Sequence, residues 1–251
     1  MEKIKMITCM IIIAASVIAQ ALEMSVDEIM QKVAETQRGV ETEYAEFQTI
    51  LLDKKGKENK RELIFVAKYE SEDKIRIDIK SPEDIKDTKF LLRGDEQWLY
   101  MPTLKRSLKI ASNSRKQRFV GSDFIYEDIE LENPEKHSYE LSDTKNEHWI
   151  IKAFPKNKSA YGFRKLWVRQ DNYFVMQTEY HDEQDQLVKK RTDSNIKEIQ
   201  PSIWRAEKIT MEDLVNQTKT TLIFQKRVVN IDLPSKIFNS KNLSESIKKQ
   251  D

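Results

Sequence analysis

Short runs in which polar and apolar side chains alternate dominate the chain between residues 44 and 229. The clearest run is Lys74–Ile79, where three isoleucines face one way and Lys74, Arg76 and Asp78 face the other. Strict alternation of this kind predicts a β-strand with one face against the core and the other face in water. Polar turn sequences separate neighbouring runs, as in β-hairpins. The predicted strands are Tyr44–Leu52, Arg61–Tyr69, Lys74–Ile79, Lys89–Arg93, Gln97–Met101, Ser138–Ser142, His148–Phe154, Lys165–Arg169, Tyr173–Tyr180, Gln186–Arg191, Trp204–Met211 and Thr218–Val229.

The spacing of these runs predicts the fold class. About eleven or twelve short strands at intervals of roughly ten residues are typical of an antiparallel sandwich or barrel. Strands do not alternate with helices, so the pattern does not indicate a doubly wound parallel sheet. No internal repeat or low-complexity linker interrupts the chain, and its length suits one all-β domain. We therefore expect a mainly β fold in a single domain over residues 22–251.

One segment has helical periodicity. Apolar residues from Val26 to Val33 recur at intervals of three and four. Ser25 is a good N-cap residue, Glu28 completes a capping box, and Gly39 ends the pattern. The sequence predicts an amphipathic helix that lies on one face of the sheet.

Large aromatic residues are frequent in the predicted strands. An antiparallel sheet has two faces, and one helix covers little of either. The aromatics therefore indicate either a packed barrel core or a concave apolar surface for a ligand. They are Phe65, Trp98, Tyr100, Trp149, Phe154, Trp167, Phe174, Tyr180, Trp204 and Phe224.

The N-terminal residues have the pattern of a signal peptide for export. Lys3 and Lys5 precede an apolar stretch from Met6 to Ala19, and Ala19-Gln20-Ala21 has small residues where a signal peptidase cleaves. We expect residues 1–21 to be a cleaved signal peptide and the mature chain to begin at Leu22, in the periplasm. The alternative is an uncleaved anchor, which the shortness of the apolar stretch disfavours.

Composition excludes several classes of function. Removing Lys3, Lys5 and Glu2 from 43 basic and 42 acidic residues leaves 41 of each, which gives no electrostatic reason to expect nucleic acid. The only cysteine, Cys9, lies in the predicted signal peptide, so cleavage would remove it. Three histidines have no zinc-binding spacing, and no nucleophile elbow or phosphate-binding loop is present. We predict no catalytic residues, no metal and no cofactor.

Residues 118–129 mix acidic and large apolar side chains. Asp123, Glu127 and Asp128 could serve as oxygen ligands to a metal, although their spacing fits no EF-hand. The alternative, which we prefer, is that Ser122 or Asp123 caps a short helix whose apolar residues pack on the sheet.

A run of basic residues precedes this segment. It could bind acidic headgroups or an acidic partner, or it could be an ordinary solvated loop. Its members are Lys105, Arg106, Lys109, Arg115, Lys116 and Arg118.

Two neighbouring motifs resemble a known family. Both motifs are similar to those of the outer-membrane lipoprotein-sorting proteins of the LolA and LolB superfamily. The first is the strand and basic loop Gln97–Arg106, and the second is Phe119-Val120-Gly121-Ser122-Asp123-Phe124-Ile125-Tyr126-Glu127-Asp128. Weaker similarity continues in the same order to the C-terminus. It involves Trp167-Val168, Tyr180-His181-Asp182, Trp204-Arg205 and Asp232–Phe238.

The resemblance implies a strongly curved antiparallel sheet, an incomplete β-barrel, with helices that cover a hydrophobic cavity for acyl chains. The lid would include Ile29, Met30 and Val33. The family motif comprises Gly121, Ser122, Asp123, Phe124, Tyr126, Glu127 and Asp128. We expect the cavity to be lined by Phe65, Trp98, Tyr100, Trp149, Trp167, Phe174 and Phe224.

The resemblance also implies a function. The chain would carry the acyl chains of a lipid or lipoprotein toward the outer membrane as a monomer. Its partners would be an inner-membrane exporter, for which it could be an accessory, and an outer-membrane acceptor. The alternative is a periplasmic regulator that senses lipoproteins or a signalling partner. Such regulators carry a further C-terminal domain, so the short stretch after Ser246 favours the carrier.

Overall fold

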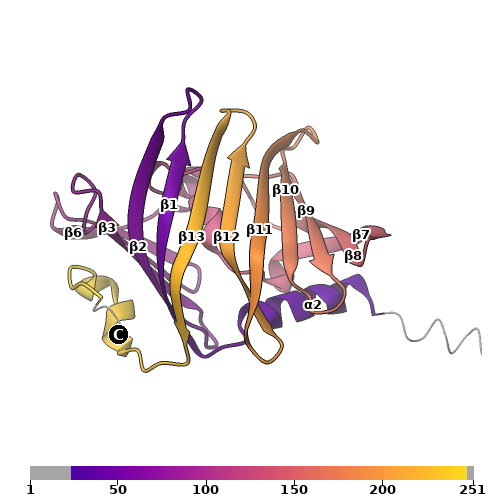
Figure 1. Cartoon of the computed structure of the whole chain (residues 1–251), viewed down its shortest axis with the longest axis horizontal. Coiled ribbons are helices and arrows are strands. Elements are labelled where there is room, and N and C mark those ends of the chain that lie inside the picture. The colour runs from indigo at the N-terminus through magenta and orange to yellow at the C-terminus, as the bar shows by residue number, and fades with distance from the viewer. Residues whose placement is uncertain (1–23, 248–251) are drawn as a thin grey trace, which may run out of the picture.

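The described part of the chain, residues 24–247 of a computed structural model, is built around one antiparallel sheet. The sheet curves strongly but does not close, so the predicted incomplete barrel is confirmed (Figure 1). The predicted signal peptide, residues 1–21, lies outside the described residues. The strands are β1 Thr42–Leu52, β2 Glu58–Lys68, β3 Lys74–Ser81, β4 Lys89–Arg93, β5 Glu96–Met101, β6 Arg106–Lys109, β7 His137–Lys145, β8 His148–Pro155, β9 Phe163–Arg169, β10 Val175–His181, β11 Leu187–Gln200, β12 Ile203–Asp213 and β13 Thr218–Val229.

The order of the strands determines how the chain covers the sheet. From edge to edge it runs β6-β5-β4-β3-β2-β1-β13-β12-β11-β10-β9-β8-β7. The two edge strands, β6 and β7, are thus consecutive in the sequence, although they lie at opposite ends of the sheet. The connection between them, residues 110–136, must cross the open side of the half-barrel. We call this connection the crossover segment.

Four short 3-10 helices make up most of the crossover segment, with a sharp turn at Val120 and Gly121, where φ is +47° and +75°. The expected helix cap at Ser122 or Asp123 was wrong. Ser122 ends one 3-10 helix, and Ile125 precedes the next. The Asp123 carboxylate cannot act as a cap because it binds hydroxyl groups of β13 instead. The four helices are η1 Ser112–Lys116, η2 Phe119–Gly121, η3 Tyr126–Ile129 and η4 Pro134–Lys136.

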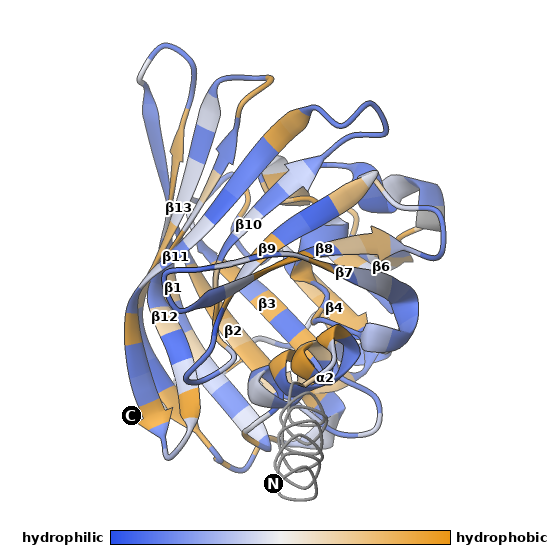
Figure 2. Ribbon diagram, turned by 90° about the vertical axis from the view of Figure 1, so that its right-hand side faces the viewer, coloured by the Kyte–Doolittle hydropathy of each residue, from blue (hydrophilic) through white to orange (hydrophobic). Residues whose placement is uncertain are grey.

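The predicted helix is confirmed as α2, Val26–Gln37, with the capping box of Ser25 and Glu28. Its buried residues, which include Met30 and Val33, pack against Ile151 and Leu166 of β8 and β9. Figure 2 shows α2 across the lower side of the interior that the sheet encloses. Within residues 24–247, no helix is long and apolar enough to cross a membrane.

The two faces of the sheet have different coverings. Phe65 of β2 lies opposite Ile77 of β3, which lies opposite Phe90 of β4, and these residues belong to the core of the inner, concave side. Their neighbours in the sequence point outward. Phe119 of the crossover segment packs edge-on against Phe90, with ring centroids 5.3 Å apart. The crossover segment therefore completes the inner core.

The outer face of β3 is not wet, so that prediction was wrong. Arg76 and Asp78 are fully buried there as an ion pair with a distance of 2.7 Å between Nε and Oδ1. The C-terminal segment, residues 231–247, excludes water from them, and Figure 1 shows it beside β2 and β3. Its two 3-10 helices are η5 Ser235–Phe238 and η6 Ser240–Asn242.

The buried pair also binds the C-terminal segment directly. Arg76 donates hydrogen bonds to the carbonyl oxygens of Ile237 and Glu245. Asp78 accepts one from the backbone N–H of Ile247 at 3.1 Å. Around these bonds, apolar side chains of the segment pack on β1, β2 and β4. Polar and apolar contacts together fasten the C-terminus to the outer face.

We expect Asp78→Ala to lower the free energy of unfolding by about 3–5 kcal/mol, because it leaves the Arg76 charge buried without a partner. Urea unfolding followed by tryptophan fluorescence measures this loss. The Arg169–Asp171 pair is a matched control because it has the same two-bond geometry, but Asp171 is 59% exposed. Asp171→Ala should cost about 0.2–1 kcal/mol. Equal losses in the two variants would contradict the structural role of the buried pair.

Candidate ligand cavity

A cavity of about 1110 Å³ lies between the inner face of the sheet, the crossover segment and α2. This volume slightly exceeds the range of roughly 300–1,000 Å³ that is common for small-molecule sites. The cavity has no single chemical character. One wall is apolar and comes from strands near the middle of the sheet, and the opposite wall is polar.

The apolar wall combines side chains that the strand register brings together. Phe47 lies opposite Leu63 across β1 and β2, and Phe47 also lies opposite Phe224 of β13. The rings of Phe47 and Phe224 are 5.1 Å apart. Ile77 and Ile79 extend the same surface onto β3. We define the apolar wall as Phe47, Leu63, Phe65, Ile77, Leu222 and Phe224.

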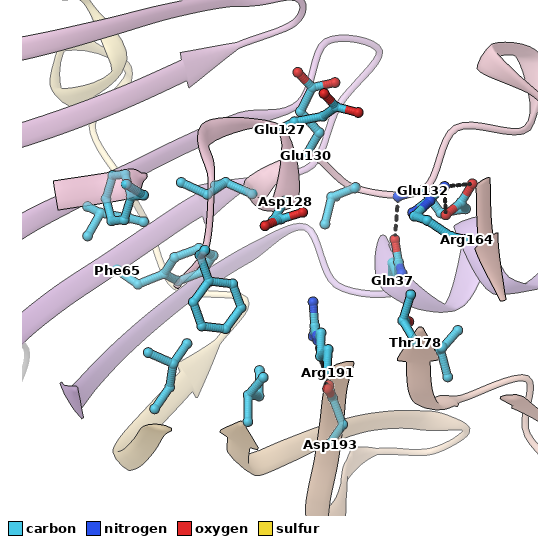
Figure 3. A pocket seen from close by; sticks show the side chains of 18 of the residues that line it. Gln37, Phe65, Glu127, Asp128, Glu130, Glu132, Arg164, Thr178, Arg191 and Asp193 are labelled. Atoms are coloured by element: carbon cyan, nitrogen blue, oxygen red, sulfur yellow. Dashed lines mark hydrogen bonds and ion pairs between the residues drawn. The ribbon is translucent and has the colours of Figure 1, made fainter. Parts of the chain in front are cut away.

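The polar wall begins at β11. Arg191 donates two hydrogen bonds to Asp193, from Nε at 2.7 Å and from Nη2 at 2.8 Å. Thr178 of β10 lies directly opposite Arg191 in the register. In Figure 3, Phe65 lies on one side of the pocket and Thr178 on the other, with Arg191 and Asp128 between them. We define the polar wall as Asp128, Tyr161, Thr178, Tyr180, Arg191 and Asp193.

Asp128 enters the polar wall from the crossover segment. Its carboxylate accepts hydrogen bonds from the Tyr161 hydroxyl at 3.0 Å and from the Ile125 backbone N–H at 2.8 Å. Burial, the largest influence, raises the pKa of the Asp128 carboxyl, and the nearby Glu127 adds to this effect. The surroundings of Asp128 therefore disfavour negative charge.

Asp123 fixes the middle of the crossover segment to the sheet. Its carboxylate accepts hydrogen bonds from the hydroxyls of Thr218 and Thr220 on β13, and its backbone N–H donates to Thr220 Oγ1 at 2.9 Å. Its carbonyl accepts from Lys189 Nζ of β11 at 2.7 Å. The side chain and the backbone of one residue thus bind two strands.

Arg61 of β2 makes another bond to the crossover segment. Its guanidinium donates to the carbonyl oxygen of Val120, while its Nε is buried without a hydrogen-bond partner. The side chain lines the cavity near the turn at Gly121. The crossover segment is therefore attached to the half-barrel at β2 as well as at β11 and β13.

Glu132 joins the end of the crossover segment to the sheet and to α2. Its side chain lies 3.0 Å from Arg164 of β9 and accepts a hydrogen bond from the Tyr139 hydroxyl at 2.8 Å. Its backbone N–H donates to Gln37, and its carbonyl accepts from Arg38 at 2.9 Å. Burial opposes ionisation of Glu132, but Arg164 and other partners outweigh it and lower the pKa. The same pairing raises the pKa of Arg164.

A second ionic cluster closes the end of the cavity beside α2. Glu43 of β1 is 2% exposed and pairs with both Arg205 and Arg227. Arg205 also donates to the carbonyl oxygens of Thr36 and Gln37, the last residues of α2. These bonds satisfy carbonyl groups that the end of a helix leaves unpaired.

Three of the seven predicted aromatics, Phe65, Phe174 and Phe224, line the cavity. The other four do not, which corrects their assignment. Trp98 and Tyr100 point to the outer face and pack near the C-terminal segment, because each pairs with an outward residue of β4. Trp167 also points outward, whereas its neighbour Leu166 lines the cavity.

Trp149 faces inward but packs in the cluster that α2 covers, where it stacks on Tyr173. Of the three expected lid residues, Val33 lines the cavity, while Ile29 and Met30 are buried between α2 and the sheet. The motif residues Ser122, Phe124, Glu127 and Asp128 also line the cavity. The remaining motif residues support them: Gly121 and Asp123 shape and fix the crossover segment, and Tyr126 packs in the inner core.

The polar wall was missed. One signal for it was available, since residues 187–194 have no continuous apolar face. A strand of this kind must place charges inward as well as outward. The sequence alone did not show that Arg191 and Asp193 point toward the cavity.

Comparison with known proteins supports this fold. A family model described as "Uncharacterized protein" matches residues 71–245. The structure is similar to that of an outer membrane lipoprotein-sorting protein domain from Vibrio parahaemolyticus, with 26% identity, a TM-score of 0.83, and coverage of 87% of this chain and 98% of that one. No curated protein sequence matches the chain.

Two further structures share the fold. A DUF1329 family protein from Desulfovibrio piger has 22% identity and a TM-score of 0.79, over 87% of this chain and 98% of its own. A LolA superfamily protein from Nitrosomonas europaea has 20% identity and a TM-score of 0.72, over 86% of this chain and 98% of its own.

We expect Glu132→Gln to lower the free energy of unfolding by about 3 kcal/mol at neutral pH, because Arg164 loses its ionic partner. Because the folded pKa of Glu132 is lowered, its contribution is present above the unfolded value of about 4.3 and is lost as the pH falls through the folded value. Urea unfolding between pH 3 and pH 7 measures both proteins. The difference between them should shrink toward pH 3, and a constant difference would contradict the ionic role.

Proposed function

We propose a function from one premise: the chain belongs to the family matched over residues 71–245 and has the fold of the LolA superfamily. It acts in the periplasm as a monomeric, non-enzymatic carrier that binds the acyl chains of a lipid or lipoprotein. It receives them from an inner-membrane exporter, to which it is an accessory, and delivers them to an acceptor at the outer membrane. Residues 22–251 form its single carrier domain, after a cleaved signal peptide.

The observation that carries this proposal is the covered apolar wall. Exposure to water costs an acyl chain about 0.8 kcal/mol per methylene group, so a lipid cannot cross an aqueous compartment unprotected. The six side chains of the apolar wall, partly covered by the crossover segment, offer a concave apolar surface on which an acyl chain loses much of its contact with water. Transfer then requires only that donor, carrier and acceptor differ in affinity, so no cofactor is needed.

Extraction of the protein with organic solvent, after purification from the periplasm without detergent, tests the proposal. Mass spectrometry of the extract should find a bound lipid in amounts comparable with the protein. An extract without lipid from a folded protein would contradict the carrier function and would favour recognition of a protein partner.

We expect Phe65→Glu to weaken uptake of a fluorescent fatty acid at least tenfold, because it places a carboxylate on the apolar wall beside the acyl chain. Fluorescence titration measures binding, and circular dichroism verifies the fold.

Trp167→Glu is the matched control. Trp167 is also a half-buried strand aromatic, but it lies outside the cavity, so its replacement should leave uptake within about twofold. Equal effects of the two substitutions would show that the acyl chain does not contact the apolar wall.

A further inference from the structure

The polar wall is an unusual surface for a cavity that holds only hydrocarbon. Buried charges are costly unless they are paired, and a cavity for acyl chains alone gains nothing from them. Here the change from apolar to polar lining occurs between neighbouring strands. Ile209 of β12 lies opposite Leu222 on one side and opposite Asp193 on the other. A bound molecule that fills the cavity therefore contacts both kinds of surface.

The polar wall carries no net positive charge that would attract an anionic ligand. Arg191 is already paired with Asp193 through two hydrogen bonds. Asp128 and Glu127 are held by neutral donors, and within the described residues neither has a basic nitrogen within ion-pair distance. Recognition of phosphate usually relies on arginine or lysine whose positive charge is not already balanced by a neighbouring carboxylate. The wall carries an excess of carboxylates instead.

Hydrogen-bonding groups on the same wall remain unused. In the described structure, Arg191 Nη1, the Tyr180 hydroxyl and the Thr178 hydroxyl make no hydrogen bond, although all three residues line the cavity. Asp128 offers carboxylate oxygens from the opposite side (Figure 3). The wall therefore presents donors and acceptors together. A hydroxyl group both donates and accepts, whereas a phosphate oxygen mainly accepts.

The environment of Asp128 supports the same conclusion. Burial raises the pKa of its carboxyl, which means that this part of the cavity disfavours added negative charge. A phosphate at the same position would meet the same penalty.

We propose that the polar wall binds the headgroup of the cargo and selects an uncharged headgroup rich in hydroxyl groups, such as a glycerol or sugar unit, over a phosphorylated one. The acyl chain of the same molecule lies on the apolar wall, so this inference rests on the proposed carrier function.

Two lipids with the same chain and different headgroups test the selection. Monooleoylglycerol and oleoyl lysophosphatidate each compete with a bound fluorescent fatty acid, at concentrations below those at which they form micelles. Monooleoylglycerol should displace the probe at a concentration at least ten times lower. Equal potency, or a preference for the phosphorylated lipid, would overturn the selection while leaving the carrier function intact. Failure of the probe and of both lipids to bind would overturn the carrier function itself.

Two variants connect the selection to the polar wall. Asp128→Asn removes a carboxylate, and Asp193→Asn releases the Arg191 charge, so each should reduce the preference for monooleoylglycerol severalfold. Asp185→Asn is the control, because Asp185 lies in the exposed turn between β10 and β11, and it should leave the preference unchanged. If both wall variants keep the wild-type ratio, the polar wall does not make the selection.

Discussion

The connection between the two edge strands is the constraint on which the rest of this structure depends. Because β6 and β7 are consecutive in the sequence but lie at opposite edges of a thirteen-stranded sheet, residues 110–136 have to cross its open side. The crossing creates the interior. It places Phe119 and Tyr126 against the inner face, and it leaves a cavity where its side chains do not reach the sheet. Without attachment to the central strands, this segment would be a long loop over exposed hydrophobic residues.

That attachment is polar, although the interior is largely apolar. Asp123 binds the threonine hydroxyls of β13, and Glu132 joins the sheet to α2. Such bonds are directional, so they determine where the segment lies, whereas apolar contacts alone would tolerate sliding. The outer face follows the same rule. There the Arg76–Asp78 pair positions the C-terminal segment, and the surrounding apolar contacts exclude water.

The division of the cavity into two walls connects the fold to the proposed function. A half-barrel whose middle strands are apolar and whose β10 and β11 are polar suits an amphipathic molecule better than a pure hydrocarbon. The Arg191–Asp193 pair balances the one positive charge of the polar wall, and we propose that the remaining donors and acceptors select the headgroup. The similarity to a lipoprotein-sorting domain concerns the fold that forms the cavity, whereas the polar wall concerns the kind of molecule that the cavity would bind.

The sequence by itself determined the capped helix, the resemblance to the lipoprotein-sorting proteins and every strand except β6, because these depend on local periodicity and short motifs. The short strand β6 had been assigned to a basic loop. Alternation also shows which residues of a strand share a face, but it does not show which face is inside. The sequence assigned Trp98 and Tyr100 to the cavity, and it assigned Arg76 and Asp78 to water. In the structure all four lie on the outer face, where residues 231–247 pack near the two aromatics and bury the ion pair. The tertiary structure alone decided this, because burial depends on contacts between segments far apart in the chain. The polar wall has the same origin: Arg191 and Asp128 are 63 positions apart, and only the crossing of the open sheet places them on one cavity.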